Sequence, residues 1–306
     1  MAGVTDRVFR EIVYELAPGL AYTEMISAMA LLYANPRTFK MIDFEPHRPL
    51  AVQLFGSKPE VMAEAAKVVE ARCAPTFIDI NMGCPTPKIV SNGDGAALMK
   101  RPQLAAEIVE AVASSVQVPV TVKIRAGWDE SSINAPEFAK LMVKAGAQAV
   151  AVHGRTRSQF YTGTADWEIV RAVAEAVDVP VIGNGDIMDV ETAAERLATS
   201  GCAGIMIGRG ALGNPWLISR ARKLIAEGEA PQPPSAQERL EMAINHLQRA
   251  VAYEGEEIAV PAMRKHIAWY LKGLRGASEV KTYIQTLKSA DEVVAALKEY
   301  QAKLAN

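Results

Sequence analysis

The sequence lacks the features that define several classes of protein. Its 306 residues contain only three cysteines, Cys73, Cys84 and Cys202, without CxxC spacing, which argues against a disulfide framework and a structural zinc site. No apolar run approaches the ~20 residues that span a bilayer, and the opening MAGVTDRVFR carries no apolar signal segment. The net charge of −2 gives no global sign of nucleic-acid binding. We therefore expect a cytoplasmic protein without membrane contact and without a metal site.

What the sequence does have is a repeated alternation of strand and helix signals. Short apolar segments typical of strands buried on both faces occur at 21–24, 50–55, 77–81, 120–124, 149–153, 181–184 and 204–208. Between them, stretches such as 59–71 and 135–146 carry apolar residues at i, i+3 and i+4, which predicts helices. Repeated βα units predict a parallel sheet, either closed as a barrel or open and doubly wound.

Polar residues at the ends of these strands favour a TIM (β/α)8 barrel, in which the strand ends form one face that carries the active site. They are Glu24, Gln53, Asn81, Lys123, His153, Asn184 and Arg209. Only seven strands are visible, and the chain opens on the helical pattern of 8–17. We therefore expect that the first barrel strand is missing from this sequence and that the natural protein begins upstream.

A second boundary follows the barrel. Residues 227–235, EGEAPQPPS, are rich in proline and charge and are typical of a linker. Ser235 and Glu238 form a capping-box signature for the helix that follows. The sequence predicts a catalytic barrel over 1–230 and a small helical domain over 236–306.

Two glycine-containing segments, 184–186 (NGD) and 208–210 (GRG), follow the last two strands. Backbone amides at such glycines and a helix N-terminus attract phosphate in barrels, and Arg209 could add a bidentate contact. The glycines could instead serve only as turn residues. The presence of both segments at neighbouring strand ends favours a phosphate site.

Polar side chains on the other strands indicate what else could bind there. Lys123 is either a salt-bridged lysine or a cation that faces an anionic cofactor or a developing enolate, and its position at the strand end favours the second role. His153 alone would be interpreted as a hydrogen-bonded core residue, but Arg155 and Arg157 follow it and suggest phosphate or uracil contacts. The amides of Gln53 and Asn81 suit the edge of a planar heterocycle or could cap loops.

The three cysteines differ in their surroundings. Cys73 and Cys202 lie among small and apolar residues and are interpreted as structural. Cys84 follows the strand 77–81 in the longest connection of the set, which favours a reactive role for its thiol.

A basic segment occurs near the C-terminus. RKHIAWYLKGLRGASEVK (264–281) has five Lys or Arg residues against one Glu, with Trp269 and Tyr270 interleaved. It could be a solvated amphipathic helix or a helix that contacts RNA, and a barrel that binds a phosphorylated ligand favours the second interpretation.

Several motifs together resemble a known family. They are MAGVTDRVFR, TEMIS, VQLFG, NMGCP, VKIRAGWD, HGRTRSQFYTG, GNGDI and IGRGALGNPW, in this order. The sequence resembles the flavin-dependent tRNA-dihydrouridine synthases over essentially its whole length, and the bacterial B-type branch most of all. The combination of NMGCP, GNGD and GRG is specific, whereas each alone would not be.

The resemblance implies a TIM barrel that holds FMN, takes electrons from NADPH and reduces the C5–C6 bond of a uridine in tRNA. Hydride addition at C6 leaves an enolate that must be protonated at C5, and a thiol with a pKa near ~8.5 is mostly protonated at pH 7. Cys84 is accordingly the implied proton donor. A monomer is expected, with the helical domain binding the tRNA.

The resemblance also implies binding residues. The cofactor residues are Met1, Ala2, Gln53, Lys123, His153, Asn184, Gly185, Asp186, Gly208 and Arg209, with the last five at the ribityl phosphate. The substrate residues are Asn81, Arg155, Arg157, Arg264, Lys265, Lys272 and Arg275.

Two other functions stay open at this point. The first is an FMN barrel that reduces a free pyrimidine or small enone, as dihydroorotate-dehydrogenase-like enzymes do; the basic helical tail distinguishes the two, because a small substrate does not require it. The second is a non-catalytic RNA-binding protein on a barrel that has lost its activity, which would not bind a flavin that NADPH can bleach.

Overall fold

Each strand of the sheet pairs in parallel with a strand of the neighbouring βα unit. The strands are β1 (Ala21–Tyr22), β2 (Ile26–Ser27), β3 (Leu50–Phe55), β4 (Phe77–Asn81), β5 (Val120–Arg125), β6 (Ala149–His153), β7 (Val181–Asn184) and β8 (Gly204–Met206). Their order is β1-β3-β4-β5-β6-β7-β8, and β2 lies further along the same edge of β3 because Ala21 pairs with Leu50 and Ile26 pairs with Leu54. The computed structural model, which describes residues 1–17, 19–43 and 48–305, thus has seven strand positions, one for each predicted strand.

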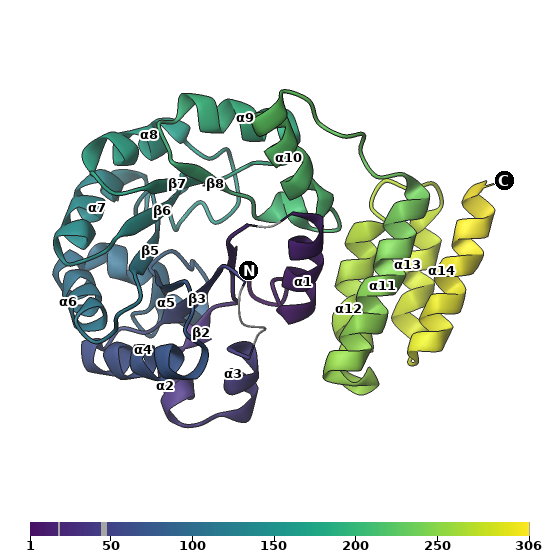
Figure 1. Cartoon of the computed structure of the whole chain (residues 1–306), viewed down its shortest axis with the longest axis horizontal. Helices are drawn as coiled ribbons and strands as arrows, with labels where there is room; N and C mark the ends of the chain where they lie inside the picture. Colours follow the sequence, from purple (N-terminus) through teal and green to yellow (C-terminus); the bar gives the residue numbers. More distant parts are fainter. Residues whose placement is uncertain (18, 44–47, 306) are drawn as a thin grey trace. The chain divides into compact units, whose positions relative to one another are not determined.

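This sequential order confirms the predicted class, a parallel β/α sheet of the barrel type followed by a helical region. Within the described ranges the order ends at β1 and β8, and no ladder joins these two strands. Figure 1 shows the strands in an arc with α4, α6, α7, α8 and α9 on its outer side.

The helices of this part begin at recognisable N-terminal signals. They are α2 (Ala28–Leu32), α3 (Pro36–Met41), α4 (Pro59–Cys73), α5 (Pro87–Val90), α6 (Pro102–Ala113), α7 (Ala135–Lys144), α8 (Trp167–Ala176) and α9 (Val190–Thr199), with short 3-10 helices η1 (Gly95–Lys100) and η2 (Glu130–Ser132). Proline occupies the first turn of α3, α4, α5, α6 and α7, where its missing N–H leaves no bond unmade. Asp166 caps α8 by accepting from the N–H of Glu168.

The central strands alternate in a way that the apolar appearance of the sequence concealed. In β4, Ile78 and Ile80 are fully buried and alternate with Asp79 and Asn81. Successive side chains of a strand point to opposite faces. The apolar set therefore faces the helices, and the polar set lies on the opposite face of the sheet.

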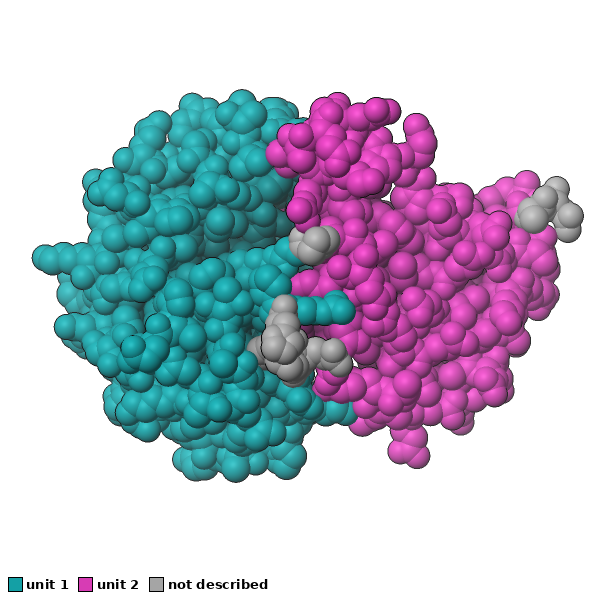
Figure 2. Space-filling view, in the orientation of Figure 1, with its two compact units in different colours: residues 1–2, 19–187, 191–208 teal, residues 3–18, 188–190, 209–306 magenta. Residues whose placement is uncertain are grey.

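Contacts between residues divide the chain into two compact units, coloured separately in Figure 2. Unit 1 comprises residues 1–2, 19–187 and 191–208, and unit 2 comprises residues 3–18, 188–190 and 209–306. Helices α1 (Arg7–Leu16) and α10 (Trp216–Glu227) thus group with the C-terminal helices. The predicted functional division into 1–230 and 236–306 stays a prediction.

Unit 2 is helical. After η3 (Arg209–Ala211) and α10, it contains α11 (Ala236–Glu254), α12 (Glu256–Tyr270), α13 (Ala277–Thr286) and α14 (Ala290–Ala305). The predicted capping box is confirmed, because the Ser235 hydroxyl accepts from the Glu238 N–H and the Glu238 carboxylate accepts from the Ser235 N–H. None of the described helices is long and apolar enough to cross a bilayer.

The basic segment 264–281 is not one helix. Helix α12 ends at Tyr270 and α13 begins at Ala277, and between them Gly273 and Gly276 adopt the left-handed φ values of +82° and +74°. Tyr270 is only 1% exposed and belongs to the core of α11–α14. Tyr270, one of the two aromatic residues of this segment, is therefore used in packing.

Candidate active site

The polar residues of the central strands share one face of the sheet. Gln53, Asp79 and Thr121 are paired across β3, β4 and β5. Two residues further along these strands, Asn81 of β4 pairs with Lys123 of β5. Two residues beyond Lys123, Arg125 pairs with His153 of β6, and His153 pairs with Asn184 of β7. Residues paired in a parallel ladder point to the same side. The structure thus brings most of the predicted strand-end residues onto a common surface within unit 1.

A chain of hydrogen bonds runs across this face. The Asp79 carboxylate accepts from the Thr121 hydroxyl at 2.6 Å and from Gln53 Nε2 at 2.7 Å. Gln53 Oε1 in turn accepts from Asn81 Nδ2 at 2.8 Å. Asn81 Oδ1 accepts from the backbone N–H groups of Gly83 at 3.1 Å and Cys84 at 2.9 Å. Asp79 and Thr121 were missed from the sequence, although a carboxylate inside the apolar run FIDIN was a usable signal.

Two charged residues, the fully buried Asp79 and the half-buried Lys123, lie on this face without forming a direct ion pair. Burial and the Arg125 charge lower the pKa of Lys123 to about 7, while the Asp79 charge opposes this. Burial raises the pKa of Asp79 to about 6, against the hydrogen bonds from Thr121 and Gln53 and the Lys123 charge. Among the described residues, the Lys123 ammonium has no hydrogen-bond partner. An anionic ligand beside Lys123 would supply one and raise the pKa of its ammonium again.

The loop that carries Cys84 is held from three sides. Asn81 caps its N–H, Arg125 Nε donates to the Gly83 carbonyl at 2.8 Å, and the Ala96 N–H donates to the Cys84 carbonyl at 3.0 Å. Gly95 approaches so closely, at φ +59°, that a Cβ there would lie 2.9 Å from the Cys84 carbonyl oxygen. The Cys84 thiol is half-buried and lies 3.4 Å from the Thr86 hydroxyl.

The other two cysteines have the surroundings of packing residues. The thiol of Cys73 donates to the Val69 carbonyl at 3.0 Å within its own helix, and burial raises its pKa to about 12. Cys202 is 8% exposed, and burial raises the pKa of its thiol as well. Neither environment favours the reactivity that a donor or nucleophile needs.

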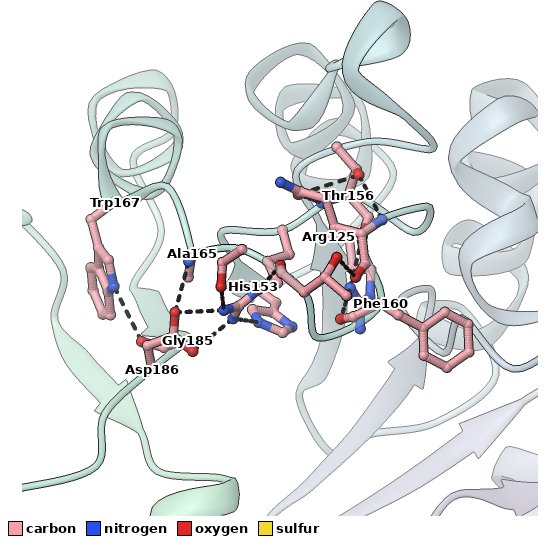
Figure 3. A network of polar contacts seen from close by, with 12 residues as sticks. Arg125, His153, Thr156, Phe160, Ala165, Trp167, Gly185 and Asp186 are labelled. Carbon is pink, nitrogen blue, oxygen red and sulfur yellow. Dashed lines mark hydrogen bonds and ion pairs between the residues drawn. The ribbon is translucent and has the colours of Figure 1, made fainter.

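The segment 184–186 is fastened by a buried arginine, Arg155. Figure 3 shows Gly185 and Asp186 of this segment with Ala165, Trp167 and His153 around them. Arg155 is 2% exposed, and its guanidinium meets the Asp186 carboxylate through both terminal nitrogens, at 2.8 and 2.7 Å. Its remaining donors reach the carbonyls of Thr162 at 3.1 Å and Gly163 at 2.7 Å and His153 Nε2 at 3.4 Å. These contacts use all five N–H donors of a guanidinium.

The predicted contact between Arg155 and the substrate stays a prediction, and in this structure the guanidinium has no donor left for it. Such a contact needs a free N–H donor, and the described protein groups occupy every one. Because a guanidinium only donates, His153 Nε2 is the acceptor in this contact. Arg155 serves instead to fix Asp186 and the loop 162–163.

The backbone at this point has two successive positive φ angles. Gly185 has φ +136°, and Asp186 has φ +51°, which is rare for a residue other than glycine. A Cβ at Gly185 would overlap Ala165 and lie 3.1 Å from the His153 ring. The Ala165 N–H donates to the Asp186 carboxylate at 2.8 Å, and Trp167 Nε1 donates to the Gly185 carbonyl at 3.2 Å. Groups from the segment after β6 thus hold this turn in place.

Three further predicted residues come together beside this turn. Asn184 Nδ2 donates to the Met206 carbonyl at 2.8 Å. A Cβ at Gly208 would lie 3.7 Å from Met1 Sδ and 4.0 Å from Asn184 Nδ2. Met1, Asn184 and Gly208 are therefore neighbours within unit 1, to which Ala2 also belongs. Arg209 follows Gly208 in the chain and opens η3 of unit 2, and its predicted phosphate contact stays a prediction.

The remaining predicted substrate residues fall into two groups. Arg157 lies 4.7 Å from the ring centre of Trp128, and its buried Nε has no partner in the described structure. In unit 2, Arg264 donates to the Leu287 carbonyl at 2.9 Å. The predicted substrate contacts of all four residues of unit 2, Arg264, Lys265, Lys272 and Arg275, stay predictions.

The donor set tests which ligand this face could hold. Among the described residues, the face combines a lysine without a hydrogen-bond partner, two amides that each keep one N–H outside the hydrogen-bond chain, and a glycine turn next to a further amide. Such a set fits a molecule with a planar heterocycle and an anionic group. The fold and this face together define a β/α-barrel protein with a polar face at its strand ends and a half-buried thiol in the loop after β4.

Comparison with known proteins identifies the family. A model of the dihydrouridine synthase (Dus) family matches residues 1–306. The chain is 45% identical to the "Probable tRNA-dihydrouridine synthase" of Rickettsia conorii, over 92% of this chain and 85% of that protein. It is 42% identical to the enzyme of that name from Rickettsia bellii, over 100% and 94%, and 38% identical to "tRNA-dihydrouridine synthase B" of Pseudomonas aeruginosa, over 100% and 92%.

The chain therefore belongs to the dihydrouridine synthase family, whose enzymes are flavin-dependent oxidoreductases. The resemblance found in the sequence motifs is confirmed, and a B-type enzyme is among the relatives.

Proposed function

We propose that this enzyme reduces the C5–C6 double bond of specific uridines in tRNA, with FMN as its cofactor and NADPH as its electron source. The observation that carries the proposal is Cys84, a thiol held just past the end of β4, beside the face that carries Lys123. The names of the relatives, which are tRNA-dihydrouridine synthases, support the substrate class. We expect the enzyme to act in the cytoplasm and as a monomer.

The residues of the chain then take distinct roles toward the cofactor. When bound, FMN supplies the hydride that adds to uracil C6. The Gln53 amide and the Lys123 ammonium face the heterocycle, and Lys123 stabilises negative charge on it. The phosphate is held by Asn184, Gly185, Asp186, Gly208 and Arg209, and the Met1–Ala2 backbone and His153 complete the cofactor site.

Cys84 completes the reduction on the substrate. Addition of hydride at C6 moves the electrons of the C5–C6 bond onto the C4 carbonyl oxygen, so C5 of the resulting enolate requires a proton. The Cys84 S–H bond breaks, the proton goes to C5, and the thiolate is afterwards reprotonated from solvent. A positioned general acid of this kind contributes about 10²–10⁴ in rate.

We assign the other polar residues to positioning and RNA contact. Asn81 orients the Cys84 loop, and Arg155 holds the phosphate-side turn. The RNA is contacted by Arg157, Lys265, Lys272 and Arg275, whereas Arg264 supports the turn that carries Leu287. Because the target base must leave its stack, a pocket with basic groups at its rim suits this substrate.

The test separates the two halves of the reaction. Cys84→Ala should retain FMN and NADPH oxidation while single-turnover reduction of tRNA falls by about 10²-fold or more. Cys73→Ala removes a thiol of packing character and is the matched control, with both halves expected near wild type. If Cys84→Ala reduced tRNA at the wild-type rate, the assignment of the proton donor would be wrong.

A second test distinguishes tRNA from a free pyrimidine or small enone. Deletion of residues 236–306 is unsuitable, because α1 packs on α11, where Arg249 bonds Glu11 and Glu15. The double substitution Lys272→Ala and Arg275→Ala should instead weaken tRNA binding and reduce its salt dependence by about two charges. Lys298→Ala, at an exposed cation of the same unit, is the control. A small-substrate reductase would show no salt-dependent change.

A further inference from the structure

Asp79 lies at the start of the hydrogen-bond chain, and no proposed step of the reaction uses it. It is 0% exposed and lies in the middle of β4, between Gln53 of β3 and Thr121 of β5. Its two hydrogen-bond partners on this face are neutral donors, at 2.6 and 2.7 Å, rather than an arginine or lysine. A buried carboxylate is costly, so its presence here calls for a role beyond packing.

The chain has a direction because each link presents a donor at one end and an acceptor at the other. An ionised carboxylate only accepts, so Gln53 must turn its NH2 group toward Asp79 and its oxygen toward Asn81. Asn81 must then donate to Gln53 and keep its own oxygen for the N–H groups of Gly83 and Cys84. A reversed Asn81 amide would bring its NH2 group against those two N–H donors.

We propose that Asp79 is a positioning residue for proton delivery, since through Gln53 and Asn81 it imposes the single amide orientation that holds the Cys84 backbone. The inference rests on the proposed function only for the final step, the transfer of the proton to uracil. The fixation of Cys84 itself is a property of the protein alone.

If the hydrogen bonds have this direction, exchanging the residues at positions 79 and 81 should restore the arrangement that Asn81→Asp alone destroys. In Asn81→Asp, two carboxylates flank the Gln53 amide, and its single oxygen must face one of them. In the double variant Asp79→Asn/Asn81→Asp, the new amide at position 79 donates to Gln53, and Gln53 donates to the new carboxylate at position 81. That carboxylate accepts from the Cys84 N–H, and the number of buried charges is the same as in the wild type.

The pH profile gives a signature that a merely structural effect would not produce. In Asn81→Asp, like charges raise the pKa of one carboxyl. While that carboxyl is protonated it donates to the Gln53 oxygen and the chain is intact, so the defect should grow as pH rises. Among the described residues, Lys123 and Arg125 of β5 and Tyr22 of β1 act electrostatically on this site, and the Cys84 thiol at the end of the chain also titrates. All four are unchanged between the variants.

Two readouts on FMN-bound protein test the proposal. The first is the alkylation rate of Cys84 by iodoacetamide, followed by peptide mass spectrometry, which needs no tRNA. The second is single-turnover reduction of tRNA between pH 6 and 9. Asn81→Asp should change the alkylation rate of Cys84 at least about threefold, and it should lower the rate of tRNA reduction about tenfold at pH 8. The double variant should return both to within about twofold of the wild type, because it again has one acceptor-only carboxylate at an end of the chain.

The two readouts also separate this inference from the proposed function. A double variant no better than Asn81→Asp in alkylation and in tRNA reduction would overturn the inference. If the wild type itself failed to reduce tRNA, the proposed function would fall, while the alkylation rates would still decide the role of Asp79. If Asn81→Asp failed to fold, recovery of a folded protein by Asp79→Asn would support the directional chain, and failure to recover it would contradict it.

Discussion

Two carboxylates of unit 1, Asp79 and Asp186, are stabilised by different kinds of hydrogen-bond donor. Asp186 meets the guanidinium of Arg155 through two bonds and also accepts from a backbone N–H. Asp79 has a hydroxyl and an amide as its hydrogen-bond partners, and the nearby Lys123 forms no ion pair with it among the described contacts. The first arrangement fixes the backbone turn at Gly185 and Asp186. The second leaves the Lys123 ammonium without a described protein partner and determines the orientation of the Gln53 and Asn81 amides.

The two carboxylates differ in whether the neighbouring cation keeps N–H donors for a ligand. The donors of Arg155 are all engaged by protein groups in this structure, so its observed contribution is rigidity. A lysine whose pKa is lowered to about 7 and which lacks a hydrogen-bond partner among described residues can respond to a ligand. The predictions below test this difference, from the largest expected effect to the smallest.

The largest effect should come from breaking the strong pair. Arg155→Met leaves the Asp186 carboxylate without its cation and should destabilise the protein by about 3 kcal/mol, because an uncompensated, partly buried charge remains. Urea denaturation measures this free energy. Arg171→Met is the matched control, since its ion pair with Glu168 is exposed, at 42% and 73%, and should cost at most about 1 kcal/mol. Equal losses in the two variants would show that the Arg155 pair is not special.

A smaller effect concerns the pH dependence of Lys123. Its folded pKa of about 7 lies below the model-peptide value of 10.5, so the unfolded chain binds more protons between these values and stability should rise with pH there. One proton corresponds to at most about 1.4 kcal/mol per pH unit. In FMN-free protein, Lys123→Met should flatten the rise between pH 7 and 9, measured by urea denaturation. The exposed Lys140→Met should keep the wild-type slope.

The smallest effect concerns Asp79 and has the opposite sign. Its folded pKa of about 6 lies above its ordinary value of 3.8, so its contribution is fully present below that value and is lost as pH rises through 6. Relative to Asp79→Asn, the wild type should lose on the order of 1 kcal/mol between pH 4 and 6. Glu175→Gln, at an exposed position, controls for the charge change. A wild type that gained stability relative to Asp79→Asn over this range would contradict the burial argument.

Local signals explain which elements could be predicted from the sequence. Seven strand positions and the Ser235–Glu238 capping box followed from apolar runs and from residue types at fixed spacing. The segment 264–281 was misjudged because its composition was considered without its two glycines, which end one helix before the next begins. At the predicted strand 21–24, only Ala21–Tyr22 is a strand, and the short β2 that follows was indicated by no local pattern.

Contacts between distant parts of the chain could not be predicted. Arg155 and Asp186 are 31 positions apart, and nothing in either motif shows that one consumes the donors of the other. Strand register decides that Gln53, Asp79 and Thr121 form one layer. A pattern of residues locates the face of the site, but only the paired strands show which side chains bind one another and are thereby lost to a ligand.

The central claim is that this enzyme adds two hydrogens to uridine in tRNA and that Cys84 supplies one of them. The most direct measurement is nucleoside mass spectrometry of unmodified tRNA incubated with the FMN-loaded protein and NADPH. We predict dihydrouridine at defined positions with the wild type and with Cys73→Ala, and a steep loss with Cys84→Ala. NADPH oxidation with no dihydrouridine in tRNA, together with reduction of a free pyrimidine or enone, would contradict the account.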